Sequence, residues 1–183
     1  MLFRSINFQV PTASPAGTQR IGVRVAETGE LVAGGSLLIG SSSPGFFSLS
    51  RDGKGQAAAL NEDGTPNGAP SPAARGSVAQ LFGTGQGPVI PEVADGEAAP
   101  SGSLAKTVAV PTSDGTSCLN SQPSVCVAIG STFGEVLYSG LAPGFVGVWQ
   151  INVRIPANAQ TGNQNVRAVI NATPSNIVTL AIR

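Results

Sequence analysis

The stretch INVRIPANAQTGNQNVRAVI, from Ile151 to Ile170, decides the fold of this chain. Apolar residues occupy every second position on both sides of a central loop: Ile151, Val153 and Ile155 before it, Val166, Ala168 and Ile170 after it. Such a period of two predicts antiparallel strands that bury one face and expose the other. The loop from Pro156 to Gly162 suits a strand connection, because proline cannot donate to a ladder and glycine tolerates positive φ.

The same pattern occurs a second time near the amino end. The stretch INFQVPTASPAGTQRIGVRV, from Ile6 to Val25, aligns with Ile151 to Ile170 at an offset of 145 residues without a gap. Five positions are identical: Ile6/Ile151, Asn7/Asn152, Pro11/Pro156, Gly17/Gly162 and Gln19/Gln164. A strand, a loop and a second strand matching in order indicate one supersecondary unit that occurs twice.

The second copy is preceded by further strand-like runs. They are Ser77–Gly83, Lys106–Val110, Val125–Ile129, Glu135–Tyr138 and Phe145–Ile155. With the strands near Val166 and Val178, they make about seven strands over residues 76–183. That number and spacing predict an antiparallel β-sandwich of the immunoglobulin-like kind.

The first copy predicts only part of such a module. We expect residues 1–40 to be the back half of a truncated module, with strands at Ile6–Val10, Arg20–Ala26 and Leu31–Ile39. Residues 1–5 are expected to be non-native, and the native chain is expected to continue upstream. Residues 41–75, rich in Gly and Pro, are expected to bridge the modules, with a strand-like run at 56–60. Free pairing edges in residues 6–39 would favour folding back on the second module, or a strand-exchange homo-oligomer.

The composition agrees with an all-β chain and narrows the function. The 183 residues include 24 glycines and 14 prolines, ten basic and ten acidic residues, and no histidine. Without histidine, Ser-His-Asp or Cys-His catalysis and His-ligated metal sites are excluded. A balanced charge argues against a nucleic-acid partner. No apolar run reaches the length of a membrane-spanning helix, so no membrane span is expected.

The two cysteines predict a local disulfide. Cys118 and Cys126 have seven residues between them, among them Pro123, and no neighbouring cation that would activate a thiol. Two ligands cannot complete a zinc site. Two unpaired, buried thiols are the alternative. A disulfide implies an oxidising compartment outside the cytoplasm.

Four clusters contain residue types that occur in binding or catalytic sites. The loop from Asn61 to Asn67 has oxygen ligands for calcium, but Asp63-Gly64 is also a turn signal, and a turn is favoured. Gly83 to Pro88 is predicted to be a strand exit rather than a phosphate loop. The other two clusters are the acids Glu92, Asp95 and Glu97, expected in a solvated loop, and the aromatics Phe133, Tyr138, Phe145 and Trp149, of which Trp149 is expected in the core. We therefore predict no catalytic, cofactor or metal residues.

Several segments together resemble a known family. They are SPGFFSL (43–49), GQAAALNEDGTPN (55–67), PAARGSVAQLFGTGQGPV (72–89), GEVLYSGLAPGFVGVWQINVRIP (134–156) and SNIVTLAIR (175–183). This order of motifs resembles the uncharacterised Solibacter-type carboxy-terminal domain of acidobacterial exported proteins, and residues 76–183 also resemble IPT/TIG-type immunoglobulin-like modules. The resemblance implies export and a carboxy-terminal position in a larger protein. Residues 113–124 look like an insertion relative to that family.

These features predict a non-enzymatic structural or adhesion module, extracellular or at the cell surface, that needs no cofactor. Its partners would be neighbouring modules of the same parent chain, or a surface polysaccharide or protein. The alternative is a carbohydrate-binding module that serves a catalytic region elsewhere, with Tyr138 or Phe133 at its site. Binding to a defined polysaccharide would separate the two.

Overall fold

The computed structural model describes residues 6–113, Cys118 and residues 124–183, and the expectation about residues 1–5 lies outside them. The described chain is all-β, as predicted, with sheets that are almost entirely antiparallel. It divides into two compact units, Met1–Ser41 and Ser42–Arg183. Among the described residues, no helix is long and apolar enough to cross a membrane.

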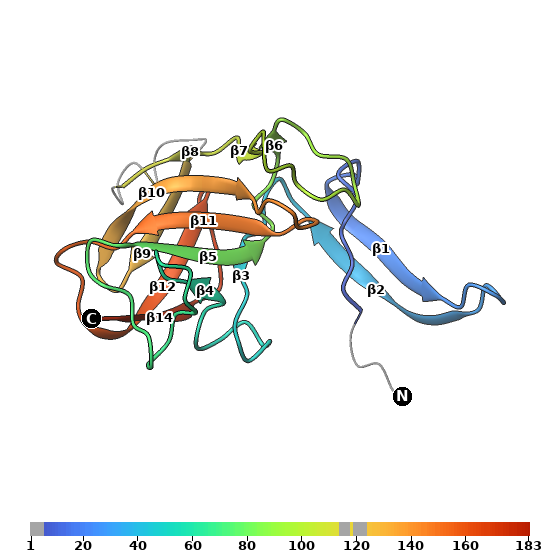
Figure 1. Ribbon diagram of the computed structural model, residues 1–183. Coiled ribbons are helices and arrows are strands. Elements are labelled where there is room, and N and C mark those ends of the chain that lie inside the picture. Colours follow the sequence, from blue (N-terminus) through green and yellow to red (C-terminus); the bar gives the residue numbers. More distant parts are fainter. Residues whose placement is uncertain (1–5, 114–117, 119–123) are drawn as a thin grey trace. The chain divides into compact units, whose positions relative to one another are not determined.

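The first unit contains one two-stranded sheet (Figure 1). Strand β1 (Gly17–Arg24) pairs antiparallel with β2 (Leu31–Ile39), and Ile21 and Val23 lie on its better-covered side. The prediction of a strand at Ile6–Val10 is wrong, because this segment has no regular secondary structure. The reason is that a strand needs a ladder, and among the described residues no strand pairs with this segment.

The backbone confirms that the repeat is structural. The amide of Ser14 donates to the Pro11 carbonyl at 3.0 Å, and the amide of Ala159, at the equivalent position, donates to the Pro156 carbonyl at 3.0 Å. Gly17 and Gly162 then open the next strand with φ of 101° and 90°, a region that favours glycine. Their cross-strand partners are also alike, Ile39 and Ile182. The two copies therefore share a turn, a glycine and a strand pairing.

The second unit is built from two groups of paired strands that share β10 (Figure 1). The first group contains β3 (Gly45–Phe46), β4 (Ala59–Leu60), β5 (Val78–Thr84), β6 (Val89–Ile90), β7 (Lys106–Thr107), β10 (Thr132–Leu141) and β11 (Trp149–Arg154). The second contains β8 (Val110–Pro111), β9 (Ser124–Ile129), β12 (Gly162–Ile170), β13 (Thr173–Pro174) and β14 (Val178–Ile182). This arrangement is consistent with an immunoglobulin-like β-sandwich.

Strand β10 passes from one group to the other. Its first residues, Thr132 to Gly134, pair with β9, and the stretch from Glu135 onward pairs with β11. Gly134 stands at the crossing, where a Cβ would collide with the Val153 side chain. The long strand thus needs glycine where the two groups of strands approach each other most closely.

The core lies between the inward faces of these strands. Trp149 is fully buried, as predicted, and its ring stacks on Phe46 with centroids 5.3 Å apart and planes 6° apart. The other large, fully buried side chains are Leu81, Val125, Val127, Ile129, Ile151, Val153, Ile155, Val166, Ile170, Val178 and Leu180. Each stabilises the fold by roughly 1.5–3 kcal/mol relative to an exposed position. The alternating positions read from the sequence are therefore the core positions.

Residues 42–75 belong to the second unit, where asparagine side chains attach them to its last strands. The Asn67 amide donates to the Ala181 carbonyl and its oxygen accepts from the Ala181 amide, both at 2.9 Å. Asn176 holds Phe46 in the same way, accepting from its amide at 2.7 Å and donating to its carbonyl at 3.0 Å. A side-chain amide thus takes the place of a neighbouring strand, which lets an irregular segment cover the core.

Candidate binding face

The outward side of β10, β11 and β5 carries a continuous group of polar and aromatic residues. Tyr138 stands opposite Asn152, which stands opposite Gln80; in the next row Gln150 stands opposite Phe82. These five residues form what we call the β10–β11–β5 face, and all are partly exposed. The alternation that buries Ile151 and Leu81 necessarily turns them outward.

Tyr138 is fixed in this face by its own strand. Its hydroxyl donates to the Leu141 carbonyl at 2.7 Å, and its ring lies over Gly140, where a Cβ would meet the ring carbon Cζ at 2.8 Å. Partial burial raises the pKa of Tyr138, because it disfavours the charged phenolate. The ring therefore presents a rigid, uncharged surface.

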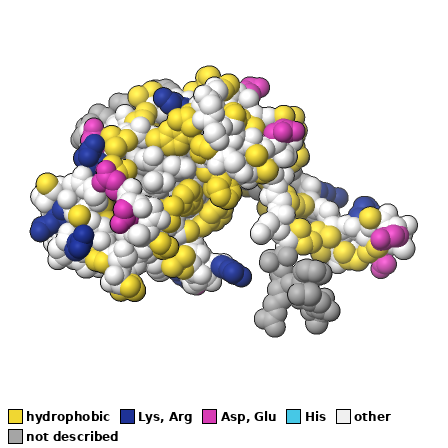
Figure 2. All heavy atoms as spheres, in the orientation of Figure 1, with side chains coloured by type: hydrophobic (Ala, Val, Ile, Leu, Met, Phe, Trp, Pro, Cys, Tyr) yellow, Lys and Arg dark blue, Asp and Glu magenta, His cyan; other side chains and the backbone are white. Residues whose placement is uncertain are grey.

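The amides complete the chemistry of the face. Gln150 Nε2 donates to Asn152 Oδ1 at 2.8 Å, which orients both side chains. The nearest ion pair lies at the end of the strands, where Arg154 Nε donates to Glu135 Oε2 at 3.0 Å with both side chains about half exposed. Figure 2 shows hydrophobic side chains gathered over this part of the second unit. Rings beside amide donors and acceptors suit an uncharged, polar ligand.

The four aromatic residues weighed in the sequence are not brought together. Trp149 is in the core, and its Nε1 donates to Ser139 Oγ at 3.0 Å. Phe133 and Phe145 are 36% and 58% exposed, but Phe133 belongs to the part of β10 that pairs with β9. Five residues of strand, about 16 Å, separate it from Tyr138. Only Tyr138 joins the face.

Four residues of the face were missed in the sequence: Gln80, Phe82, Gln150 and Asn152. A signal was present, since Asn152 is a polar position of the alternating stretch that decides the fold, and Gln150 continues the alternation just before that stretch. What was missing was the register that places β5 beside β11, and no local pattern gives that register.

The loop from Asn61 to Asn67 is a turn in which the side-chain Oδ1 atoms of Asn61 and Asp63 accept hydrogen bonds from within the loop. Asn61 Oδ1 accepts from Asn67 Nδ2 at 2.9 Å, and Asp63 Oδ1 accepts from the amide and hydroxyl of Thr65 at 3.0 and 2.6 Å. These bonds, led by that from the Thr65 side chain, lower the pKa of Asp63. The arrangement favours the turn over the calcium loop. Within the described residues, no group of three or more Cys, Asp or Glu side chains could hold a metal.

The glycine-rich and acidic segments are both placed as expected. Gly83 pairs with Phe46, and a Cβ on Gly83 or Gly85 would collide with the backbone of Gly45 or Ser43. Their glycines let another strand approach, which is the strand exit expected. The acids at positions 92, 95 and 97 are exposed between β6 and β7.

An open hollow of about 620 Å³ lies between residues 44–54 and the end of β13. Phe47, Lys54, Arg167 and Ile177 contribute side chains to it. Its central polar group, Asn176, already bonds the backbone of Phe46 and Gly53. The hollow is therefore a by-product of the way that this segment is attached.

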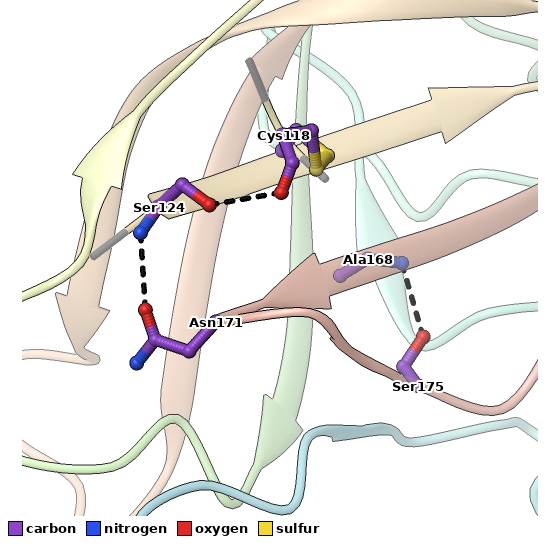
Figure 3. Close-up of a disulfide and its surroundings, with 6 residues drawn as sticks. Cys118, Ser124, Ala168, Asn171 and Ser175 are labelled. Carbon is purple, nitrogen blue, oxygen red and sulfur yellow. Dashed lines mark hydrogen bonds between the residues drawn. A yellow bond between two sulfur atoms is a disulfide. The ribbon is translucent and has the colours of Figure 1, made fainter. Parts of the chain in front are cut away.

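Cys118 and Cys126 form the predicted disulfide, with Cα atoms 5.8 Å apart (Figure 3). Both are buried, and Ser124 Oγ donates to the Cys118 carbonyl at 3.0 Å. Asn171 holds Ser124 in turn, accepting from its amide at 3.0 Å and donating to its carbonyl at 2.9 Å. The disulfide thus joins Cys118 to β9, and the two hydrogen bonds between Ser124 and Asn171 tie the start of β9 to the turn after β12. Most of the insertion expected at residues 113–124 lies outside the described residues.

No family model, curated protein or solved structure matches this chain. A disulfide of this kind is typical of an oxidising, extracellular environment. The chain is thus an all-β protein with a buried disulfide, and arguments about its function rest on its own residues.

Proposed function

We propose that this chain is a non-catalytic structural or adhesion module of a larger exported protein. The observation that carries the proposal is the attachment of residues 42–75 to β14 and to Asn176 by side-chain amides. Together with the disulfide, these bonds give a rigid body suited to spacing or presenting neighbouring modules. Export, neighbouring modules of the same parent chain as partners, and the resemblance to Solibacter-type and IPT/TIG-type modules are parts of this proposal.

A second candidate function is favoured by the β10–β11–β5 face. Tyr138 and Phe82 provide ring surface, and Gln80, Gln150 and Asn152 provide amide donors and acceptors. This is the chemistry with which proteins contact neutral sugars. The face is open rather than a deep cleft, which suits a chain-like polysaccharide better than a small ligand.

A glycan array followed by calorimetry separates the two candidates. A structural module is expected to give no binding in the micromolar range. Micromolar affinity for one polysaccharide, lost in Gln80→Ala and Asn152→Ala but kept in Asn163→Ala, would replace the structural proposal with the carbohydrate one. Asn163 is a matched control because it is exposed on β12, a strand outside this face.

A further inference from the structure

We propose that the edge of β1 facing away from β2 is a docking site for an extended strand of another protein. The docking strand would carry apolar side chains at alternate positions and acidic side chains between them. This proposal concerns the first unit and is independent of the function proposed for the second.

The second copy of the repeat shows which neighbour fits at this edge. There, β12 pairs with β14 on one side and with β9 on the other. In the first copy, β2 occupies the place of β14, since Gly17 pairs with Ile39 as Gly162 pairs with Ile182. Among the described residues, no strand occupies the place of β9. An edge of this kind presents backbone groups to an incoming strand.

The apolar side chains of the first copy give the second argument. Ile6, Phe8 and Val10 are 63%, 56% and 39% exposed. Their equivalents Ile151, Val153 and Ile155 are each 0% exposed, because β9, β10 and β12 surround them. The first copy thus exposes apolar side chains that the second copy buries, and such exposed apolar residues are typical of a site of interaction. A strand beside β1 would turn its apolar side chains to the side of Ile21 and Val23, as β9 does beside β12.

Charge decides which strand fits. Arg20 and Arg24 lie on the outward side of β1, with Gly22 between them. If two copies of β1 paired antiparallel about Gly22, Arg20 of each would face Arg24 of the other, and like charges directly opposite are destabilising. That register is therefore disfavoured for a second copy, whereas a strand of another protein with acidic residues opposite Arg20 and Arg24 complements their charge.

The register of β9 on β12 defines a probe. Cys126 pairs with Val169, the equivalent of Arg24, and Gly130 donates to the Asn165 carbonyl, the equivalent position to Arg20. Replacing both with glutamate gives the peptide Ser-Val-Glu-Val-Ala-Ile-Glu. Its apolar residues would stand opposite Ile21, Val23 and Val25.

The test uses the full chain with this peptide at millimolar concentration. Hydrogen exchange is expected to slow at residues 17–25 and to stay unchanged at β12. A peptide of scrambled order, and one with proline at its second valine, are expected to give no protection. In an anisotropy titration, Arg20→Glu should weaken binding about five-fold, and a peptide ending in lysine should restore it.

Three results would overturn the proposal. The first is no protection of residues 17–25 by the glutamate peptide. The second is equal protection by the scrambled peptide, which would mean apolar adhesion without strand pairing. The third is that residues 17–25 are already protected in the free chain; light scattering would then assign the cover to a second copy if the chain is a dimer, or to the second unit if it is a monomer.

Discussion

At the scale of single residues, asparagine side chains form the backbone hydrogen bonds that a neighbouring strand would otherwise form. The side chains of Asn67 and Asn176 each use both a donor and an acceptor to hold the backbone of a residue far away in sequence. Asn171 holds Ser124 with its side-chain oxygen and its backbone amide. Asn67 is only 3% exposed, so its bonds form where water cannot replace them. Removing such a side-chain amide destabilises the fold, because it leaves buried backbone groups without a hydrogen-bond partner.

We therefore expect Asn67→Ala to lower the free energy of unfolding by about 1–3 kcal/mol, since the Ala181 amide and carbonyl would lose their partners. Urea unfolding followed by the fluorescence of Trp149, the only tryptophan, measures this change. Asn163→Ala, at an exposed position, is the control and should change stability by less than about 0.5 kcal/mol. Equal effects of the two substitutions would contradict the role given to Asn67.

Tyr138 makes a prediction about pH. It is the only tyrosine, so absorbance at alkaline pH reports on it alone, and its midpoint is expected above the ordinary value of about 10. Because the pKa of Tyr138 is raised in the folded state, its contribution to the free energy of unfolding is fully present below the pKa of the unfolded state. This contribution is lost as the pH rises through the pKa of the folded state. A midpoint at or below 10 in the folded protein would show that the ring is not buried as described.

At the scale of elements, the pairing between strands decides whether an alternating segment forms a strand, and the local sequence does not show this pairing. The alternation of Ile151 to Ile170 predicted two strands and their buried faces correctly. It failed at Ile6–Val10, where the same pattern has no neighbouring strand to complete a ladder. Local pattern records which side chains are apolar, whereas a strand also needs hydrogen-bond partners from elsewhere in the chain. The β10–β11–β5 face could not be predicted for the same reason, since Gln80 and Asn152 become neighbours only through the register in which β5 pairs with β11.

Close approach between elements predicts the effect of Gly83→Ala. A Cβ at this position would collide with the Gly45 carbonyl and press on the backbone of Phe46, whose ring stacks on Trp149. We expect the free energy of unfolding to fall by roughly 2 kcal/mol or more and the fluorescence emission of Trp149 to shift to the red. Gly102→Ala, with open space around it, is the control. Unchanged stability in Gly83→Ala would mean that β3 does not pair with β5 as described.

The disulfide at Cys126 of β9 is expected to contribute to the free energy of unfolding. Under native conditions no thiol of the chain should react, and reduction should lower the free energy of unfolding by about 2–3 kcal/mol, the effect expected for a loop of this size. The double variant Cys118→Ser with Cys126→Ser should match the reduced protein. Two thiols that titrate in the folded, untreated protein would remove the argument for an oxidising compartment.

At the scale of the whole molecule, one supersecondary unit occurs twice in different surroundings. The second copy is completed by β5, β9 and β10 and buries its apolar side chains. In the first copy, β1 pairs with β2, and no other strand of the described residues pairs with it. The same turn, glycine and alternation therefore belong to a buried core in one unit and to a two-stranded sheet in the other. The extent of the second unit, from Ser42 onward, depends on side-chain amides that no local pattern reveals.

Hydrogen exchange of the full chain tests this account most directly. Amides of β9, β11, β12 and β14 are expected to exchange near the rate of global unfolding, because they pair within a buried core. Amides of β1 and β2 are expected to exchange orders of magnitude faster, although β1 belongs to a copy of the unit that contains β12. Equal protection of β1 and β12 would contradict the claim that one copy is completed and the other is open.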